Sequence, residues 1–309
     1  MEFSPRIQAA LEQGRAVVAV ESTLLTHGLS YPHALDLVLE IEHHIRAGGA
    51  EPALVALSEG KLIVGLERAE QERLAKAEGN VKLTTADLGA AMVRGYSGGT
   101  TAATTAWAAH KAGIRVALAG GLGGVHRDVG DTWDISGDLT IMGSTPVIMA
   151  CGGIKTFLDI GKSLEALETL GVPVWSYKNE RFPGYFVHDS DYPALRVDNG
   201  EEIAAMAAAH WGLGLRTGIV LGASIPHASA FDKDEIEAVI KRALDGAKGF
   251  SGGKGVTPHI IRAIESFTEG RSAAANRALI VEAACAAAET AAALARQAAS
   301  CARSGNMQC

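Results

Sequence analysis

The chain of 309 residues has only four cysteines, and their spacing marks neither a metal site nor a redox pair. It contains no Cys-x-x-Cys pair and no zinc-finger pattern of histidines. We therefore expect reduced thiols at Cys151, Cys285, Cys301 and Cys309, in a protein of the cytoplasm. The neighbours of Cys151 are typical of a strand interior, which favours a packing role over nucleophilic catalysis.

The sequence also lacks clear targeting and membrane signals. Its first residues do not have the basic and then apolar layout of a signal peptide. The uncharged stretch from Leu139 to Ile154 is too short, and too rich in Gly, Ser and Thr, to span a bilayer. A formal net charge of -7 argues against a general surface for nucleic acids. We expect a protein that binds neither a membrane nor nucleic acid.

A dinucleotide-binding fingerprint is missing as well. The segment Gly120-Gly-Leu-Gly-Gly-Val-His126-Arg127 does not follow the Gly-x-Gly-x-x-Gly pattern, and no clear helix follows it. This argues against a nicotinamide cofactor, and we expect no nucleotide cofactor. Two interpretations of the segment stay open. It is either a nest of backbone N–H groups that binds an anion, with His126 and Arg127 adding donors, or a turn that only reverses the chain.

What the sequence does contain is a regular alternation of strands and helices. Short β-branched apolar runs that fit buried parallel strands are followed by stretches with apolar residues at helical spacing. The expected strands are 16–21, 53–57, 62–64, 114–118, 147–150, 172–175 and 219–221. The expected helices are 32–46, 67–78, 101–112, 163–170, 201–210, 233–247 and about 275–303. This alternation predicts a single-domain α/β/α sandwich over residues 1–309, with a mainly parallel, mixed central sheet, a mobile loop at 249–255 and a flexible tail at 300–309.

One lysine follows a strand that we expect to be buried. Lys155 emerges from the run Pro146-Val-Ile-Met-Ala-Cys-Gly-Gly-Ile through a glycine turn. An ammonium on such an apolar platform loses hydration, which favours the neutral amine. A neutral amine is a nucleophile that can form a Schiff base with an aldehyde. The alternative, a solvated lysine at the start of a helix, stays open at this point.

Other polar side chains follow strands or open helices. In doubly wound sheets, ligands collect beyond the carboxyl ends of the strands, which makes Glu21 and His126 candidates. The segment Gly98-Gly-Thr-Thr101, with an expected turn at Gly98–Gly99, opens a helix whose N–H groups could bind phosphate. Lys82 either adds a point charge or lies at the surface. The segment from Asp131 to Asp138 holds three carboxylates and two hydroxyls. These suit Mg²⁺ or Mn²⁺ or, alternatively, Asx turns.

These segments closely resemble the pseudouridine-5'-phosphate glycosidase family, also called pseudouridylate synthase. The matching motifs occur in order over nearly the whole chain, from about Ser4 to Arg296, and no single motif bears the identification. They are Val18-Ala-Val-Glu-Ser-Thr23, His27-Gly28, Gly98-Gly-Thr-Thr-Ala102, Gly120-Gly-Leu-Gly-Gly-Val-His-Arg127, Asp134-Ile-Ser-Gly-Asp-Leu139, Gly153-Ile-Lys155, Leu170-Gly-Val-Pro173, Thr257-Pro258 and the helix containing Asn276.

The resemblance implies reversible cleavage of pseudouridine 5'-phosphate with water to uracil and ribose 5-phosphate. It carries over Lys155 as the covalent nucleophile, Glu21 as the proton donor and Asp134 as the holder of a divalent metal, usually Mn²⁺, with Mg²⁺ as an alternative. It places further residues at the substrate, namely Lys82, Ala102, His126, Ser136, Gly137, Asp138 and Asn276. The family's fold is an α/β/α sandwich and its members look trimeric, so the resemblance implies a homotrimer.

Two other functions stay open from the sequence. A Schiff-base aldolase or lyase acting on another sugar phosphate would use the same lysine, and only its products would distinguish it. A sugar-phosphate sensor would bind through the glycine loops, with Lys155 merely pairing charge. A trapped covalent adduct would argue against the sensor, because a sensor has no need of a neutral lysine.

Overall fold

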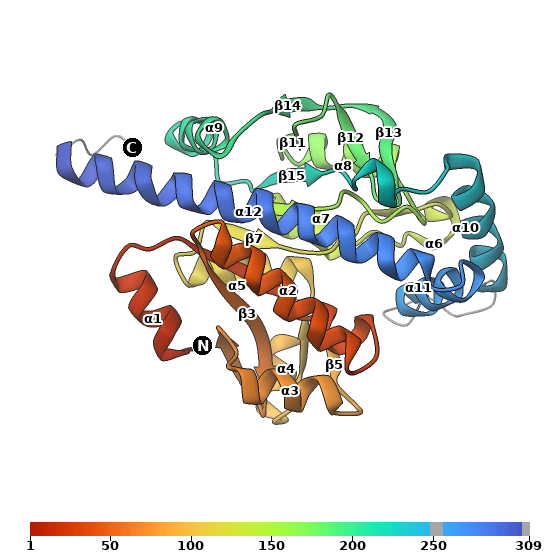
Figure 1. Ribbon diagram of the computed structural model, residues 1–309, viewed down its shortest axis with the longest axis horizontal. Coiled ribbons are helices and arrows are strands. Elements are labelled where there is room, and N and C mark those ends of the chain that lie inside the picture. Colours follow the sequence, from red (N-terminus) through yellow and green to blue (C-terminus); the bar gives the residue numbers. More distant parts are fainter. Residues whose placement is uncertain (248–255, 305–309) are drawn as a thin grey trace.

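The computed structural model describes residues 1–247 and 256–304, so the loop expected at 249–255 lies outside the described residues. A central sheet runs through the molecule, with helices on both of its faces (Figure 1). Within the described residues it has 11 strands. These are β1 (Glu2–Phe3), β2 (Val17–Glu21), β3 (Glu51–Ser58), β4 (Lys61–Val64), β5 (Val81–Leu83), β6 (Gly98–Thr100), β7 (Val116–Leu118), β9 (Ile148–Cys151), β11 (Val174–Tyr177), β14 (Leu195–Val197) and β15 (Ile219–Ala223).

The strand order is β1-β4-β3-β2-β7-β9-β15-β11-β14, with β6 joined to β3 and β5 joined to β6. From β3 through β2, β7, β9, β15 and β11 to β14, every neighbouring pair is parallel. In this register Ala19 pairs with Ala53 on one side and with Ala117 on the other. Strand β3 pairs in antiparallel fashion with β4 and β6. The predicted mixed, mainly parallel sheet is therefore confirmed.

The side chains of β2 alternate between two hydrophobic clusters on opposite faces of the sheet. Val17 and Ala19 belong to one cluster, and Val18 and Val20 belong to the other. Helices that contribute to the first cluster include α1 (Pro5–Glu12), α5 (Ala102–Lys111), α7 (Gly137–Met142) and α8 (Ile160–Thr169). Helices of the second are α2 (His33–Ala47), α3 (Arg68–Lys76), α9 (Gly200–Gly212) and α12 (Arg271–Ser304). This layering is the expected α/β/α sandwich.

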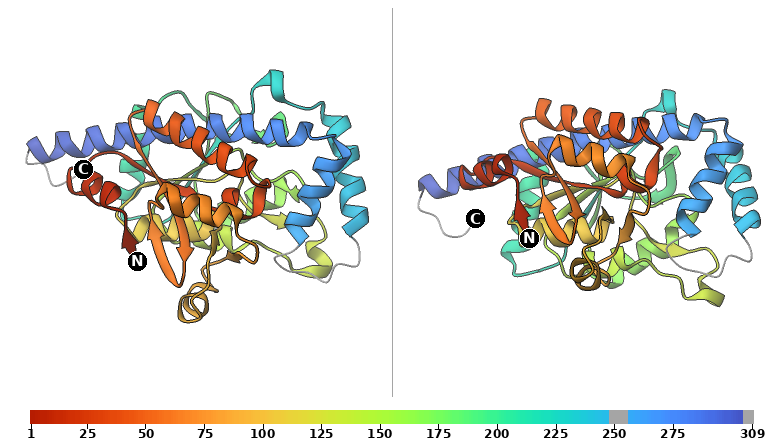
Figure 2. Two further views of the ribbon diagram at one scale, coloured as in Figure 1. Left: turned by 60° about the horizontal axis from the view of Figure 1, so that its bottom comes forward. Right: turned by 90° about the horizontal axis from the view of Figure 1, so that it is seen from below.

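Helix α12 is the longest helix in the described part of the chain. By length and composition alone it is apolar enough to span a membrane, but 56% of its most apolar window is buried inside the protein. It packs against α2, α9 and β9, and Figure 2 shows it lying alongside α2. We interpret it as a core helix. It continues through Ser304, so residues 300–304 of the expected tail are helical, and 305–309 lie outside the described residues.

The structure adds elements that the apolar patterns do not predict. The predicted turn at Gly98–Gly99 is strand β6, in which Gly98 pairs with Val81. Two short two-stranded sheets lie apart from the main one and are formed by β8 (Val125–His126) with β10 (Leu158–Asp159) and by β12 (Arg181–Gly184) with β13 (Val187–Pro193). The added helices are α1, α4 (Leu88–Val93), α6 (Val129–Thr132), α7, α11 (Val256–Phe267), the π-helix η1 (Leu24–Gly28) and the 3-10 helix η2 (His227–Ser229). Helix α10 (Lys233–Ala247) has its predicted bounds.

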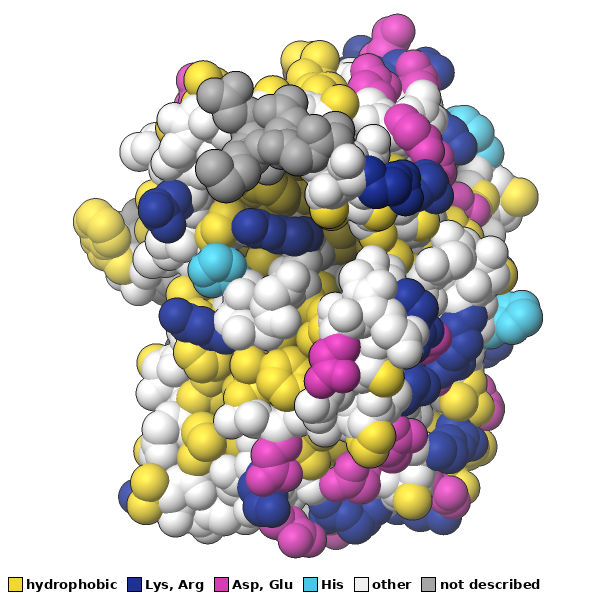
Figure 3. Space-filling model, turned by 90° about the vertical axis from the view of Figure 1, so that its left-hand side faces the viewer, with side chains coloured by type: hydrophobic (Ala, Val, Ile, Leu, Met, Phe, Trp, Pro, Cys, Tyr) yellow, Lys and Arg dark blue, Asp and Glu magenta, His cyan; other side chains and the backbone are white. Residues whose placement is uncertain are grey.

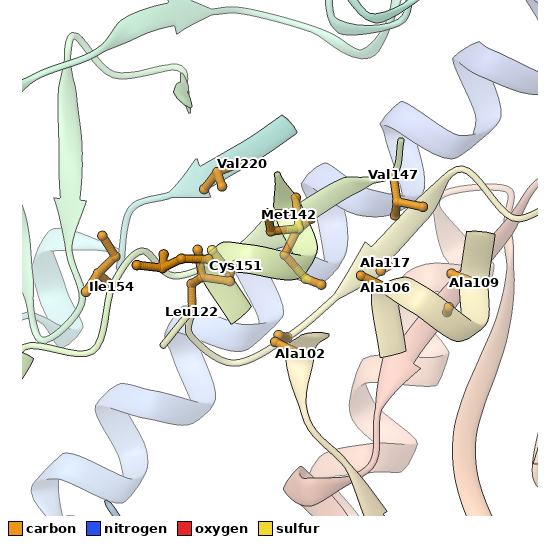
Figure 4. Close-up of a cluster of buried hydrophobic side chains, with 14 of the residues drawn as sticks. Ala102, Ala106, Ala109, Ala117, Leu122, Met142, Val147, Cys151, Ile154 and Val220 are labelled. Carbon is orange, nitrogen blue, oxygen red and sulfur yellow. The ribbon is translucent and has the colours of Figure 1, made fainter. Parts of the chain in front are cut away.

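Cys151 lies in the apolar interior, among side chains such as Leu122 and Ile154 (Figure 4). Burial raises its pKa to about 11, so the thiol stays protonated and packs as an apolar group. Cys285 is also a free thiol. Cys301 is disulfide-bonded, which corrects the expectation of a reduced thiol at that position.

On the face of the molecule that Figure 3 shows, positive and negative side chains are mixed. That view looks at the left-hand end of the molecule in Figure 1, where α12 finishes. Lys and Arg side chains are interspersed there with Asp and Glu and with apolar groups. This mixture fits the modest net charge of -7.

Candidate active site

A cavity of about 380 Å³ lies beyond the carboxyl ends of β2, β7 and β9. Its walls come from the loops after these strands, from the first turns of α5 and α7, and from α11 and α12. All the residues predicted for the site line it, namely Glu21, Lys82, Ala102, His126, Asp134, Ser136, Gly137, Asp138, Lys155 and Asn276. Residues far apart in sequence meet here because the carboxyl ends of parallel strands share one edge of a sheet.

Glu21 is the last residue of β2, and its side chain is buried, with 5% of the residue exposed. One carboxyl oxygen accepts a hydrogen bond from the Thr23 hydroxyl, and the other accepts from the Gly120 N–H at 3.3 Å. Burial raises the pKa of Glu21, and the positive charge of Lys155 opposes this shift. A carboxyl group with a raised pKa keeps its proton at a pH where an ordinary glutamate has lost it, so it can act as a general acid.

The glycine loop after β7 uses its N–H groups on acceptors within the protein. Gly120 donates to Glu21, and Gly123 donates to Asp138 Oδ2 at 2.8 Å. Asp138 Oδ1 also accepts from the N–H of Ala103 in the first turn of α5, at 2.9 Å. The interpretation as an open phosphate nest is therefore wrong for these two loop N–H groups. The carboxyl groups that accept these bonds belong to Glu21 and Asp138, and Asp138 fixes the loop against α5.

Replacing Gly123 with alanine is expected to destabilise the protein. A Cβ at this position would lie 2.3 Å from Ser136 Oγ and 2.8 Å from Asp138 Oδ2. We expect a loss of about 1–3 kcal/mol in the free energy of unfolding, the usual cost of overpacking, measured by denaturant titration. Gly130→Ala is the matched control, because Gly130 lies in α6 with nothing within 4 Å of the added Cβ. Equal stability of the two variants would contradict this role of Gly123.

Lys155 follows β9, and the two residues before it pair with neighbouring segments. Ile154 forms a bridge with Leu122 of the glycine loop, and Gly153 forms one with Gly184 of the β12–β13 hairpin. Lys155 is half-buried and lines the cavity, and of the neighbouring charges it acts most strongly on the pKa of Glu21. Helix α8 begins only at Ile160, so Lys155 does not start a helix.

Lys82 and the first turn of α5 form a positive part of the cavity wall. Lys82 lies in β5 and is half-buried, so it is not a surface lysine. Next to it, His27 has its Nδ1 2.7 Å from the Thr26 hydroxyl. Burial lowers the pKa of His27, and the charge of Lys82 lowers it further. A lysine beside a helix N-terminus at Ala102 favours an anionic group of a ligand.

The three aspartates of the 131–138 segment do not converge on one point. Asp138 is buried and bonded to backbone N–H groups, whereas Asp131 is exposed. Asp134 lies at the cavity wall with Oδ2 3.6 Å from His126 Nε2. In residues 1–247 and 256–304 no group of three His, Cys, Asp or Glu side chains could hold a metal ion. The Asp134–His126 pair fits only a cation that takes most of its ligands from water and substrate, as Mg²⁺ and Mn²⁺ do.

Arg127 does not contribute its charge to the cavity. Its guanidinium donates to the Thr156 carbonyl at 2.6 Å and pairs with Glu237 of α10. Arg127 is not one of the described residues that line the cavity. The expectation that Arg127 assists anion binding is therefore wrong. Its ion pair with Glu237 instead connects the end of the glycine loop to α10.

Several lining residues are not indicated by the sequence patterns. Tyr185 is buried, follows Pro183-Gly184 at the tip of the β12–β13 hairpin, and donates from its hydroxyl to Asn276 Oδ1 at 2.9 Å. Further lining residues are Thr23, Thr84, Thr85, Phe157, Phe186, Ile261, Ile264, Glu265 and Ser272. The turn signal Pro-Gly ahead of two aromatic residues was the one sequence cue to Tyr185.

Comparison with known proteins identifies the family. A family model described as indigoidine synthase A like protein matches residues 6–293. The pseudouridine-5'-phosphate glycosidase of Herpetosiphon aurantiacus is 42% identical over 294 residues, which is 94% of this chain and 97% of that protein. The pseudouridine-5'-phosphate glycosidase of Symbiobacterium thermophilum is 41% identical over 287 residues, covering 91% and 93% of the two chains.

Solved structures of related proteins also match this chain. The prealnumycin C-glycosynthase AlnA in complex with ribulose 5-phosphate matches with a TM-score of 0.89 and 35% identity, covering 96% of this chain and 98% of that one. An indigoidine synthase A-like protein from Thermotoga maritima matches with a TM-score of 0.86 and 30% identity, covering 92% and 94%. The chain belongs to the indigoidine synthase A-like family, in the group of pseudouridine-5'-phosphate glycosidases that its motifs resemble.

Proposed function

We propose that the protein cleaves the C–C glycosidic bond of pseudouridine 5'-phosphate with water, giving uracil and ribose 5-phosphate, and that it catalyses the reverse reaction. The observation that carries this proposal is one cavity that holds a buried carboxyl group of raised pKa, Glu21, with the amine of Lys155. The names of the relatives support the substrate, and the ribulose 5-phosphate in the solved C-glycosynthase supports a sugar-phosphate ligand.

The bond to be broken poses a particular chemical problem. It joins C1' of the ribose to C5 of uracil, so direct departure of the base would leave a costly carbanion. The pair of carboxylates that usual glycosidases employ does not remove this obstacle. In our mechanism Glu21 instead donates its proton to the ribose ring oxygen, and the bond between C1' and that oxygen breaks as the base supplies electrons. The opened sugar then exposes C1' to attack.

Lys155 completes the cleavage. Its neutral amine adds to C1', and the proton that the resulting ammonium loses balances the proton that C5 of the base takes up. The nitrogen electron pair then forms a C=N bond as the C1'–C5 bond breaks, and the departing electron pair restores the C5=C6 double bond of uracil. Water hydrolyses the resulting imine, which frees Lys155 and leaves the aldehyde of ribose 5-phosphate to close its ring. The electrostatic influence of Lys155 on Glu21 supports placing both groups at the same sugar.

The remaining predicted residues would bind and orient the substrate. Lys82 and the N-terminal turn of α5 at Ala102 are the best receptors for the 5'-phosphate. Ser136, Gly137 and Asp138 lie at the start of α7, next to the first turn of α5, where they can contact the sugar. Binding energy from the phosphate positions the sugar without taking part in the bond change. From the family resemblance we also propose a homotrimer in the cytoplasm.

Asp134 is our proposed holder of a divalent cation, Mn²⁺ or Mg²⁺, with His126 beside it. Such a cation would organise water and polarise substrate oxygens when bound. We expect Asp134→Asn to weaken Mn²⁺ binding at least about tenfold, the scale that even outer-shell substitutions reach. Electron paramagnetic resonance of free Mn²⁺ measures this directly. Asp131→Asn, at an exposed carboxylate outside the cavity lining, is the control, and equal binding by both variants would contradict the assignment.

The experiment that tests the function is incubation with pseudouridine 5'-phosphate and Mn²⁺, followed by chromatography for free uracil. We expect stoichiometric uracil and ribose 5-phosphate, and much slower turnover of pseudouridine without its phosphate. A preparation that releases no uracil from this substrate would contradict the proposal. An aldehyde product from another sugar phosphate would then indicate a different Schiff-base lyase.

A further inference from the structure

The tip of the β12–β13 hairpin has an unusual backbone at the cavity. Tyr185 has a φ of 64°, in the left-handed region that residues other than glycine rarely adopt. Such a conformation costs about 1–3 kcal/mol and persists only where surrounding contacts hold it. Here the neighbouring Gly184 bridges to Gly153, and the Phe186 ring packs edge-on against the Tyr185 ring at 4.8 Å between centroids. The hairpin tip is thus docked on the segment that leads to Lys155.

The ring of Tyr185 lies against the backbone of the glycine loop and beside Lys155. A Cβ on Gly121 would come 2.5 Å from Tyr185 Cε2 and 3.2 Å from Lys155 Cγ. Only glycine at position 121 leaves room for both side chains in these positions. Tyr185 is 5% exposed, so its hydroxyl depends on a partner within the protein.

That partner is the amide of Asn276 on α12. The Tyr185 hydroxyl donates to Asn276 Oδ1 at 2.9 Å, and Asn276 is half-buried at the cavity wall. Burial raises the pKa of Tyr185, so the hydroxyl keeps its proton and remains a donor. A planar amide whose oxygen is held in this way has its two N–H donors on the other side of the group.

We propose that Tyr185 is a positioning residue that fixes the Asn276 amide with its N–H donors toward the substrate. This inference rests on the proposed function and deepens it. The fixed amide selects an oxygen acceptor on the ligand, either a hydroxyl of the sugar or a carbonyl of the base. Without the tyrosine hydroxyl, the amide can turn its oxygen toward the ligand, and the two acceptors would then face each other.

Tyr185→Phe tests the proposal, because it removes the hydroxyl and keeps the ring that fills the space beside Gly121. We expect kcat/KM for pseudouridine 5'-phosphate to fall about tenfold, the scale of one lost hydrogen bond and its misplaced partner. Tyr177→Phe is the matched control. Tyr177 also donates to a side chain of α12, Glu289, but it is not one of the described residues that line the cavity. The control should keep wild-type kinetics, and both variants should lose similar thermal stability.

A double-mutant cycle separates positioning from a purely structural role. If Tyr185 acts through the amide, Asn276→Ala should lower kcat/KM by itself, and adding Tyr185→Phe should change it no further. Wild-type kinetics for Tyr185→Phe, or effects of the two substitutions that multiply, would overturn the inference. Wild-type enzyme that released no uracil would instead contradict the proposed function, so the two failures are distinguishable.

Calorimetry identifies which acceptor the amide binds. Titration with ribose 5-phosphate alone should show weaker affinity in Tyr185→Phe if the acceptor is a sugar hydroxyl. If that affinity is unchanged and the KM for uracil in the synthetic direction rises, the acceptor is a base carbonyl. A variant in which neither quantity changes contradicts the proposal.

Discussion

Replacing Lys155 with alanine is expected to abolish uracil release, with kcat falling by about 10⁴-fold or more. The reason is chemical, since no step of the mechanism supplies another electron pair to expel the base once this amine is gone. Lys155 lines the cavity beside Glu21, on a loop fixed by bridges at Gly153 and Ile154. Steady-state kinetics with pseudouridine 5'-phosphate measures the effect, and the circular dichroism of the variant should match that of the wild type.

Two further substitutions separate chemistry from charge. Lys155→Arg keeps a positive charge but cannot form an imine, because guanidinium stays protonated. It should therefore be as inactive as the alanine variant. Lys82→Ala removes the other lysine among the described residues that line the cavity, and we expect it to raise KM while the chemistry at Lys155 continues. An active Lys155→Arg enzyme would show that the residue only neutralises the phosphate, as in the sensor or a non-covalent mechanism.

The second large effect is expected for Glu21→Gln. The amide keeps the shape of the side chain but has no proton to donate, so kcat should fall by about 10²-fold or more. Glu42→Gln is the control, because Glu42 is also 5% exposed but lies on α2, where it accepts hydrogen bonds from Arg46 and from Gln71 of α3. If Glu21→Gln kept full activity, the proton donor would be another group.

The raised pKa of Glu21 also predicts the direction of its pH dependence. Burial makes the folded protein hold this proton more tightly than the unfolded chain does. Its contribution to stability is therefore complete below the ordinary glutamate pKa and is lost as pH rises through the raised value. Glu21→Gln should lack this loss, so its stability relative to the wild type should rise with pH over that window. In the wild type, kcat should decline as Glu21 loses its proton.

Much of the site could be predicted because its catalytic residues stand at or just after the ends of buried strands. Glu21 ends β2 and Lys155 follows β9, and an apolar run that stops at a polar residue is visible in the sequence. The geometry of parallel strands then brings such residues together. The family resemblance supplied the residues that no local pattern marks, such as Asn276 on α12.

Contacts between distant segments could not be predicted in this way. Tyr185 belongs to a hairpin outside the main sheet, and its bond to Asn276 joins positions 91 residues apart. The donors of the glycine loop looked free for phosphate because nothing local shows that Asp138 returns to bind Gly123. The glycines at 98 and 99 suggested a turn, yet they form a strand because β5 and β3 offer partners on either side. In each case the tertiary partner decides the structure.

Reductive trapping tests the central claim most directly. The protein is incubated with ribose 5-phosphate and sodium borohydride, which reduces an imine to a stable secondary amine, and its peptides are then examined by mass spectrometry. The account predicts one pentose phosphate adduct on the peptide that contains Lys155, and no adduct in Lys155→Ala. A wild-type protein that carries no adduct, or carries it on Lys82, would contradict the account.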